Sequence, residues 1–323
     1  MALVLALLNP GPALALAAAT AVGPPAPGIA QAAATSASRL PGNLTASFRS
    51  AATTLAAAAA ASTTAAAASA ATEASGQSSA DSRAVLPGLF AQALAASRNG
   101  RFGEALPLWN RVLQIAPGDA AAWSNRGNVQ LALGDPRAAI ADQERSLALE
   151  PDNPDAHLNR GTAEEALALW DLAAADYAWI LQRDPADASA LYNLGNVRGS
   201  QGDWQAARNS FAAAADARPG FAMARSSAAL AAFQLGELEE AERSLRSLIR
   251  RYPLFADARA GLTALLWQRG ARGEAESHWA AASGLDPRYR QMEWVTAVRR
   301  WPPQPAAALE SFVELTPTKL SGR

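Results

Sequence analysis

The sequence contains no cysteine, and Lys319 is the single lysine among its 28 basic residues. The absence of cysteine excludes disulfides, a thiol nucleophile, a zinc–thiolate site and a lipid anchor on an N-terminal cysteine. The net charge is −1 and only 18% of the residues are charged. The sequence therefore has neither a basic field that would attract nucleic acid nor an acidic tail that would attract a cationic partner.

Patterns typical of catalysis and metal binding are also missing. His157 and His278 are the two histidines; neither has a third ligand nearby, and we expect His157 to pack in the core. The glycines in Gly195–Gly202 lack the dinucleotide-binding spacing, and no Gly-x-Ser-x-Gly elbow occurs. Glu164 and Glu165, adjacent on a helix, are expected on an exposed face. We predict no catalytic residue, no metal site and no cofactor.

Residues 1–32 have the pattern of a secretory signal. Two apolar stretches, Ala2–Leu8 and Ala13–Val22, precede a proline-rich run and the small-x-small sequence Ala30–Ala32. The usual basic start is missing, because the first arginine is Arg39. A membrane-spanning helix is the alternative, but proline and glycine interrupt the segment and neither stretch reaches about 18 apolar residues. We expect the chain to be exported.

Residues 33–82 are a low-complexity tract of alanine, serine and threonine. Alanine favours helix, but the tract has no stripe of large apolar side chains whose burial could offset the entropy of ordering. We predict that it is a flexible tether.

A period of 34 residues runs through the rest of the chain. Prolines recur at this interval, at Pro117, Pro151, Pro185, Pro219, Pro253 and Pro287. Twelve residues before them stand Ala105, Ala139, Ala173, Ala207, Ala241 and Ala275. Eight residues before them stand large side chains: Trp109, Gln143, Tyr177, Phe211, Leu245 and Trp279. Glycine stands seventeen residues before five of the six prolines, with Ala168 as the exception.

Each position of this period has a physical role in a pair of helices. Glycine accepts the backbone conformation of a tight turn, and proline ends the second helix because its ring clashes with the preceding turn. Alanine lets the two helices approach closely, and the large side chain four residues later fills the space beside that contact. Asp119, Asn153 and Asp187 stand at expected N-caps, and Pro136 and Pro154 at first helical positions.

These motifs resemble the tetratricopeptide-repeat (TPR) family. The residues that carry the resemblance most clearly are Trp123, Gly127 and Ala139 in one unit and Leu191, Gly195, Ala207 and Phe211 in another. The resemblance implies an all-α, right-handed solenoid of about six helix-turn-helix units over residues 83–289. Ala93, Ala229 and Thr263 depart from the family pattern, since other units have glycine at these positions.

Residues 290–315 are predicted to cap the last unit, followed by a short tail over residues 316–323. We expect one amphipathic helix over Arg290–Arg300, with Trp294, Val295 and Val298 on its apolar face, and a closing helix over Ala306–Glu314. The stretch Tyr289–Phe312 is similar to the tails of TPR proteins from the thylakoid lumen of cyanobacteria and chloroplasts. That similarity implies a lumenal location, which agrees with the export signal.

The first helix of each unit should line the inner face of the solenoid. The candidate residues for binding a peptide on this face are Asn125, Asn128, Asn159, Thr162, Tyr192, Asn193, Asn196, Phe233 and Trp267. Asparagine amides can donate to and accept from an extended backbone, but they can equally satisfy neighbouring helices. Phe233 and Trp267 either form an exposed docking patch or are covered by the closing helices. Both alternatives stay open.

The sequence thus predicts a non-catalytic scaffold that binds other proteins or peptide segments, without nucleic acid or a small-molecule cofactor. The tail similarity implies an assembly or maintenance factor for a photosynthetic membrane complex in the thylakoid lumen, with subunits of that complex as partners. A periplasmic adaptor of the cell envelope is the alternative. A hydrolase with a site in the groove lacks the residues it would need.

Overall fold

The computed structural model describes residues 84–315, and this part of the chain consists of helices joined by turns, without a strand. The segments predicted as signal (1–32), tether (33–82) and tail (316–323) lie outside the described residues, and so does residue 83. The contacts divide the chain into two compact units. Residues 93–315 belong to the larger unit, and residues 84–92 belong to the other.

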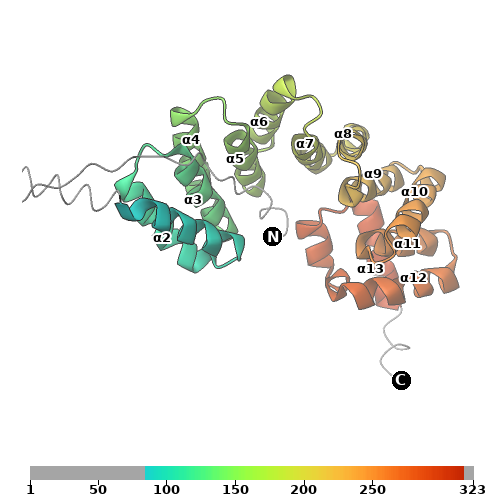
Figure 1. Cartoon of the computed structure of the whole chain (residues 1–323). Coiled ribbons are helices and arrows are strands. Elements are labelled where there is room, and N and C mark those ends of the chain that lie inside the picture. The colour runs from blue at the N-terminus through green and yellow to red at the C-terminus, as the bar shows by residue number, and fades with distance from the viewer. Residues whose placement is uncertain (1–83, 316–323) are drawn as a thin grey trace, which may run out of the picture. The chain divides into compact units, whose positions relative to one another are not determined.

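The helices alternate regularly along the chain (Figure 1). The opening helix covers residues 84–98. The later first helices have 13 residues each: α3 (Ala120–Ala132), α5 (Pro154–Ala166), α7 (Ala188–Ser200), α9 (Ala222–Gln234) and α11 (Ala256–Gln268). The second helices have 14 residues each: α2 (Phe102–Ile115), α4 (Pro136–Leu149), α6 (Trp170–Arg183), α8 (Trp204–Ala217), α10 (Leu238–Arg251) and α12 (Arg272–Leu285). Units 1 to 6 are these pairs in chain order, which confirms the predicted all-α repeat.

The predicted helix starts and turns are confirmed. Asp119, Asn153 and Asp187 accept hydrogen bonds from backbone N–H groups of the first turns of α3, α5 and α7. The turn glycines have positive φ angles, from 71° at Gly100 to 89° at Gly134. Ala168, the one non-glycine at this position, adopts the same conformation with φ at 57°. An alanine held there is strained, because its Cβ approaches the backbone too closely.

The two helices of a unit meet where small residues allow it. The six repeated alanines are at most 1% exposed. A Cβ on Gly161 would lie 2.7 Å from Cε1 of Tyr177, and one on Gly195 would lie 2.6 Å from Cδ1 of Phe211. The glycine of the first helix and the large side chain of the second therefore complement each other within one unit.

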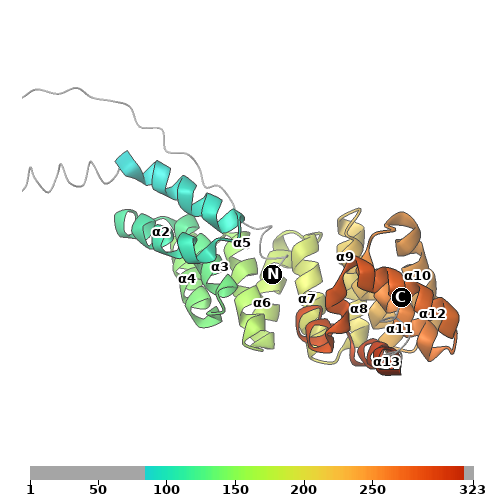
Figure 2. The same ribbon diagram turned by 90° about the horizontal axis from the view of Figure 1, so that it is seen from below.

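The first helices of successive units also contact one another, as α3 does with α5, α5 with α7, and α9 with α11. This proximity places the first helices on the inner face of the solenoid, and Figure 2 gives a second view of their succession. No helix within residues 84–315 is both long and apolar enough to cross a bilayer.

The C-terminal cap, residues 286–315, differs in part from the prediction. The single helix expected over Arg290–Arg300 is wrong: a 3₁₀ turn, η2 (Pro287–Arg290), is followed by a π-helical turn, η3 (Trp294–Val298). Val295 is fully buried, but Val298 on the expected apolar face is 53% exposed. The wide turn is followed by Arg299 and Trp301, which bind a buried carboxylate on α11.

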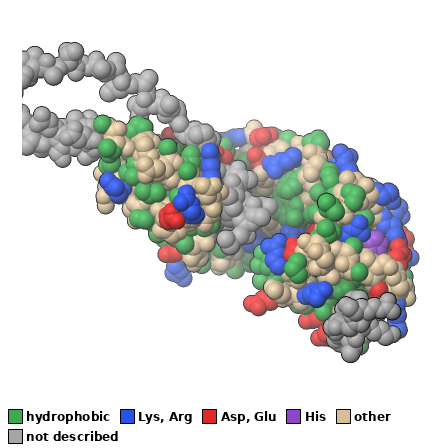
Figure 3. Space-filling model, turned by 60° about the horizontal axis from the view of Figure 1, so that its bottom comes forward, with side chains coloured by type: hydrophobic (Ala, Val, Ile, Leu, Met, Phe, Trp, Pro, Cys, Tyr) green, Lys and Arg blue, Asp and Glu red, His purple; other side chains and the backbone are tan. Residues whose placement is uncertain are grey.

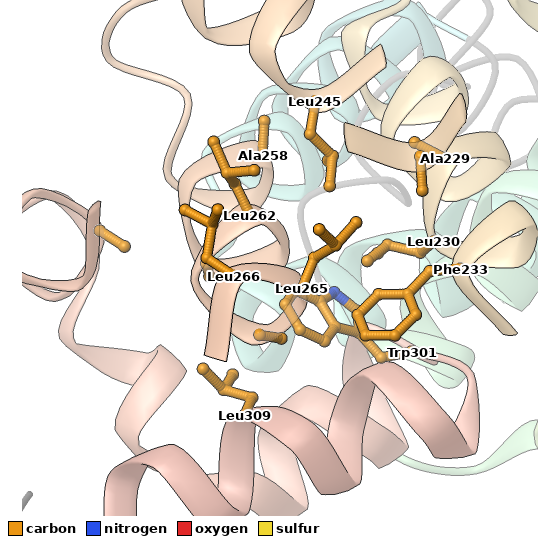
Figure 4. Packing of buried hydrophobic residues seen from close by; sticks show 14 of the residues in the cluster. Ala229, Leu230, Phe233, Leu245, Ala258, Leu262, Leu265, Leu266, Trp301 and Leu309 are labelled. Carbon is orange, nitrogen blue, oxygen red and sulfur yellow. The ribbon is translucent and has the colours of Figure 1, made fainter. Parts of the chain in front are cut away.

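The closing helix α13 (Pro303–Leu315) is present, with Leu309 and Phe312 fully buried. It packs against α11 and α9, both first helices, and therefore lies on the inner face of units 5 and 6. Figure 4 shows Leu309 and Trp301 facing Leu265 and Phe233 in this cluster. The cap thus fills part of the face that the sequence assigned to a groove.

Candidate peptide-binding groove

A buried carboxylate anchors the cap to the inner face. Asp257 of α11 is 2% exposed, and its Oδ1 accepts hydrogen bonds from Tyr289 Oη at 2.5 Å, Arg299 Nη2 at 2.8 Å and Trp301 Nε1 at 3.1 Å. Burial by itself would raise the pKa of Asp257, but the Arg299 charge and the hydrogen bonds outweigh it, so the pKa is lowered. The carboxylate therefore stays ionised and holds three side chains of the cap.

The cap covers the two apolar residues predicted for the groove. Phe233 is fully buried in the cluster that α13 completes. Trp267 donates a hydrogen bond to Ser311 at 3.3 Å and meets Phe312 edge-on at 5.4 Å. Of the two alternatives drawn from the sequence, the structure has the closing helices over the patch. Phe233 and Trp267 line the interface with the cap rather than an open groove.

The cap also reaches back to unit 3. Arg300 donates a hydrogen bond to Oε2 of Glu165 on α5, across 135 residues of sequence. Tyr177 of α6 donates to Oε1 of the same carboxylate at 2.5 Å. Arg300 has a φ of 53°, in the left-handed region that side chains rarely adopt. Burial raises the pKa of Glu165, while Arg300 and Tyr177 act to lower it.

Glu164 and Glu165 contradict the prediction of an exposed face, because each is only 5% exposed. Burial, reinforced by the nearby Asp176 carboxylate, raises the pKa of Glu164 to about 7. Arg160 on the same helix forms a bidentate pair with Asp176, at 2.7 and 2.8 Å. The prediction failed because a helix inside a solenoid has neighbouring helices on several sides, so divergent side chains can both be covered.

His157 is a packing residue, as predicted. Its Nδ1 lies 2.7 Å from Oδ1 of Asp176, and its ring stacks on Trp179 with the centroids 3.8 Å apart. No group of three or more potential metal ligands gathers anywhere in residues 84–315.

Three of the predicted amides serve the solenoid itself. Asn125 donates to the carbonyl of Ala121 in its own helix, at 2.9 Å. Asn159 donates to Ser124 Oγ of the preceding unit at 3.2 Å. Asn128 accepts from Nε2 of Gln143 at 3.3 Å. These asparagines are at most 5% exposed. Asn125 bonds within its own helix, Asn128 joins the two helices of unit 2, and Asn159 joins units 2 and 3.

The remaining predicted residues differ among themselves. Tyr192 is 5% exposed and packs between Phe211 and Phe221, which makes it a core residue of unit 4. Thr162 is partly exposed and donates to the carbonyl of Leu158 at 2.9 Å. Asn193 is buried and Asn196 is partly exposed, and the described residues give neither amide a hydrogen-bond partner. Peptide binding by the nine residues stays a prediction, and Asn196 is the amide that remains accessible and unpaired.

Asn196 lines a cleft of about 670 Å³ between units 3 and 4 and the cap. The walls come from the end of α5, the starts of α6 and α8, and the π-helical turn of the cap. They include Glu165, Trp170, Trp204, Thr296 and Arg300. Gly195 and Gly199 of α7 also line the cleft. The arrangement offers aromatic rings and hydrogen-bonding groups but no pair of reactive side chains.

The sequence analysis missed Trp170, Trp204 and Arg300 as lining residues. The two tryptophans had a signal, since both stand at the first position of a second helix, one period apart. Arg300 had no such signal, because it belongs to the cap rather than to the repeat. On the face shown in Figure 3, acidic and basic side chains are interspersed, in keeping with the net charge of −1.

Comparison with protein families supports the repeat. A family model described as tetratricopeptide repeat matches residues 92–162. A second model with the same description matches residues 158–220, 192–253 and 226–290. The matches together span residues 92–290, more than half of the chain. No curated protein matches the sequence.

Several solved structures share the fold. The APC/C hetero-tetramer Cut9–Hcn1 aligns with a TM-score of 0.57 and 16% identity over 70% of this chain and 42% of that chain. Pseudomonas aeruginosa pilF aligns with a TM-score of 0.55 and 17% identity over 64% of this chain and 94% of that chain. A tetratricopeptide repeat protein from Parabacteroides merdae aligns with a TM-score of 0.53 and 18% identity over 72% of this chain and 94% of that chain. At these identities the likeness concerns the fold alone.

Proposed function

Since the chain belongs to the tetratricopeptide-repeat family, whose fold is typically a non-enzymatic scaffold, we propose that it binds an extended segment of a partner protein and catalyses no reaction. The binding surface in this proposal is the inner face of units 3 and 4, beside the cap. Repeat solenoids commonly use such inner faces for binding.

One observation supports this location above others: the cap closes the inner face of units 5 and 6 but leaves Asn196 unpaired in a cleft. The equivalent residue two periods earlier, Asn128, already accepts a hydrogen bond from Gln143. An accessible amide without an internal partner can pair with a peptide backbone whatever the partner's side chains are.

We further propose an exported protein of the thylakoid lumen that assists assembly or maintenance of a photosynthetic membrane complex. The signal-like pattern of residues 1–32 and the similarity of the Tyr289–Phe312 stretch support this. The alternative is a periplasmic adaptor of the cell envelope, supported by the same export pattern. Fractionation of the native organism separates the two, because a lumenal protein should follow photosynthetic complexes and an envelope adaptor should follow wall or outer-membrane material.

The groove is tested by comparing two equivalent asparagines. Asn196→Ala should weaken retention of a co-purifying partner about two- to tenfold and leave Tm unchanged, because a hydrogen bond contributes about 0.5–1.5 kcal/mol. Asn128→Ala should lower Tm, since it leaves Gln143 with one partner fewer in the core. The measurements are quantitative affinity capture from the native organism and thermal unfolding of the same variants.

The reverse result would place the binding surface elsewhere. If Asn196→Ala keeps its partners at wild-type levels while folded, the cleft is not the binding surface. If it loses partners only in proportion to a fall in Tm, the amide serves the fold, as the other asparagines do.

A further inference from the structure

One column of inner-face positions shows how the cleft arises. The column repeats every 34 residues and carries Leu131, Glu165, Gly199, Phe233 and Trp267. The cap covers Phe233 and Trp267, and Arg300 pairs with Glu165. Gly199 has no side chain, so the column is interrupted between these two contacts. The cleft lies at this interruption.

The walls beside Gly199 are aromatic. Trp170 and Trp204 are the first residues of α6 and α8, and both are partly exposed. A Cβ on Gly199 would lie 2.8 Å from Cζ3 of Trp204, so the indole lies directly against the backbone of α7. A ligand in the cleft would therefore meet the Trp204 indole where it lies on α7.

The free hydrogen-bonding groups of the cleft include several donors. Within residues 84–315, neither the indole N–H of Trp170 nor that of Trp204 has a hydrogen-bond partner, and the amide of Asn196 is likewise unpaired. The acidic group of the cleft is already used, because Glu165 accepts from Tyr177 and from Arg300. Arg300 in turn is neutralised by Glu165.

We propose that the cleft binds a proline-rich segment of a partner protein in the polyproline II conformation. This proposal rests on the proposed function and names the ligand class of the groove. Proline has no backbone N–H, so such a segment presents carbonyl acceptors and needs donors from its receptor. Its rings stack on aromatic side chains, and its conformation is set before binding, which lowers the entropy cost. Trp170, Trp204 and Asn196 match these requirements.

Two other occupants fit less well. A partner helix uses its carbonyls internally, so it would leave the donors of the cleft unpaired. An acidic segment would seek a free positive charge, but Arg300 is paired with Glu165.

The test is calorimetric titration of the full chain with a proline decamer, using an alanine–serine decamer and a glutamate decamer as controls. Saturable binding of the proline decamer alone is expected. Trp204→Ala should raise its Kd at least about tenfold, since buried aromatic anchors carry much of the affinity at such sites. Trp204→Phe keeps a ring but loses the N–H and should raise Kd less. Trp123→Ala, a partly exposed tryptophan of unit 2 outside this cleft, is the matched control and should leave Kd unchanged.

Equal binding of the alanine–serine decamer, stronger binding of the glutamate decamer, or an unchanged Kd in folded Trp204→Phe and Trp204→Ala would overturn the proposal. Thermal unfolding of each variant shows whether it is folded. If the proline decamer fails to bind while Asn196→Ala still releases a captured partner, the ligand class is wrong and the proposed groove stands. If both results are negative, the groove itself is wrong.

Discussion

Units 2 to 4 and units 5 and 6 share one repeat, yet their inner faces are built from different chemistry. In units 2 to 4, polar pairs join the helices, such as Arg126 with Asp142 at 2.7 Å and Arg160 with Asp176 at the same distance. In units 5 and 6, α9, α11 and the cap share one large apolar cluster. The same positions that carry Asn128, Thr162 and Asn196 in the earlier units carry Leu230 and Ala264 in the later ones.

The difference shows what decides whether an inner face is occupied by its own chain. An apolar face gains free energy when it is covered, so a cap of similar character folds onto it. A polar face gains little from such a cap, because its amides would exchange water for imperfect partners. The boundary between the two faces lies between unit 4 and unit 5, and the cleft at Gly199 lies beside it.

The largest effect is expected in the capped half. Phe312→Ala should lower the free energy of unfolding by about 3–5 kcal/mol. Phe312 is fully buried and meets Trp267 and Trp279 edge-on at 5.4 and 5.7 Å. The measurement is urea unfolding followed by circular dichroism. Leu315→Ala, three residues further and 72% exposed, is the control and should change stability by less than about 0.5 kcal/mol. A loss below about 1 kcal/mol in Phe312→Ala would mean that the cap is not part of the cooperative core.

The polar half should respond to pH through Glu164. Its pKa is about 7 in the folded protein against 4.5 for the free side chain. Between these values the folded state binds more protons than the unfolded state, so stability falls as pH rises from about 4.5 to 7. Glu164→Gln should remove this slope and raise stability at pH 8 by on the order of 2–3 kcal/mol.

Urea unfolding at pH 5 and pH 8 measures the effect of Glu164→Gln. Glu144→Gln, a nearby carboxylate on an exposed part of α4, is the control and should keep most of the slope. If wild type and Glu164→Gln have equal pH profiles, Glu164 is ionised in the folded protein near its usual pKa.

The smallest effect is expected at the turn of unit 3, which departs from its neighbours. Ala168→Gly should stabilise the protein by about 0.5–1 kcal/mol, because it removes the strain of a φ of 57° at some cost in chain entropy. Gly134→Ala makes the opposite change at the equivalent turn and should destabilise by a similar amount. Thermal unfolding of both variants gives the comparison. Opposite signs are required, and a Tm that falls in both variants would show that Ala168 contributes packing that outweighs its strain.

Much of the fold could be predicted because its causes are local. The N-caps at Asp119 and Asp187 act within one turn, and the turn at Gly134 needs only one residue with a positive φ. The pairing of Gly161 with Tyr177 lies within one period. The 34-residue spacing repeats these rules, so the sequence alone predicted the number, approximate length and pairing of the helices in the six repeat units.

The places where the chain folds back on itself depend on tertiary contacts. The contact of Arg300 with Glu165 joins residues 135 positions apart, and no local preference or period relates them. No local preference predicts the burial of Glu164 either. Nor does one predict the hydrogen bonds of Asp257, whose partners come from the cap. Such contacts depend on which surfaces meet in space and on how apolar each one is. For this reason the pattern of asparagines predicted a polar face without indicating which amides are used internally. Only the placement of the cap separated the buried Phe233 from the accessible Asn196.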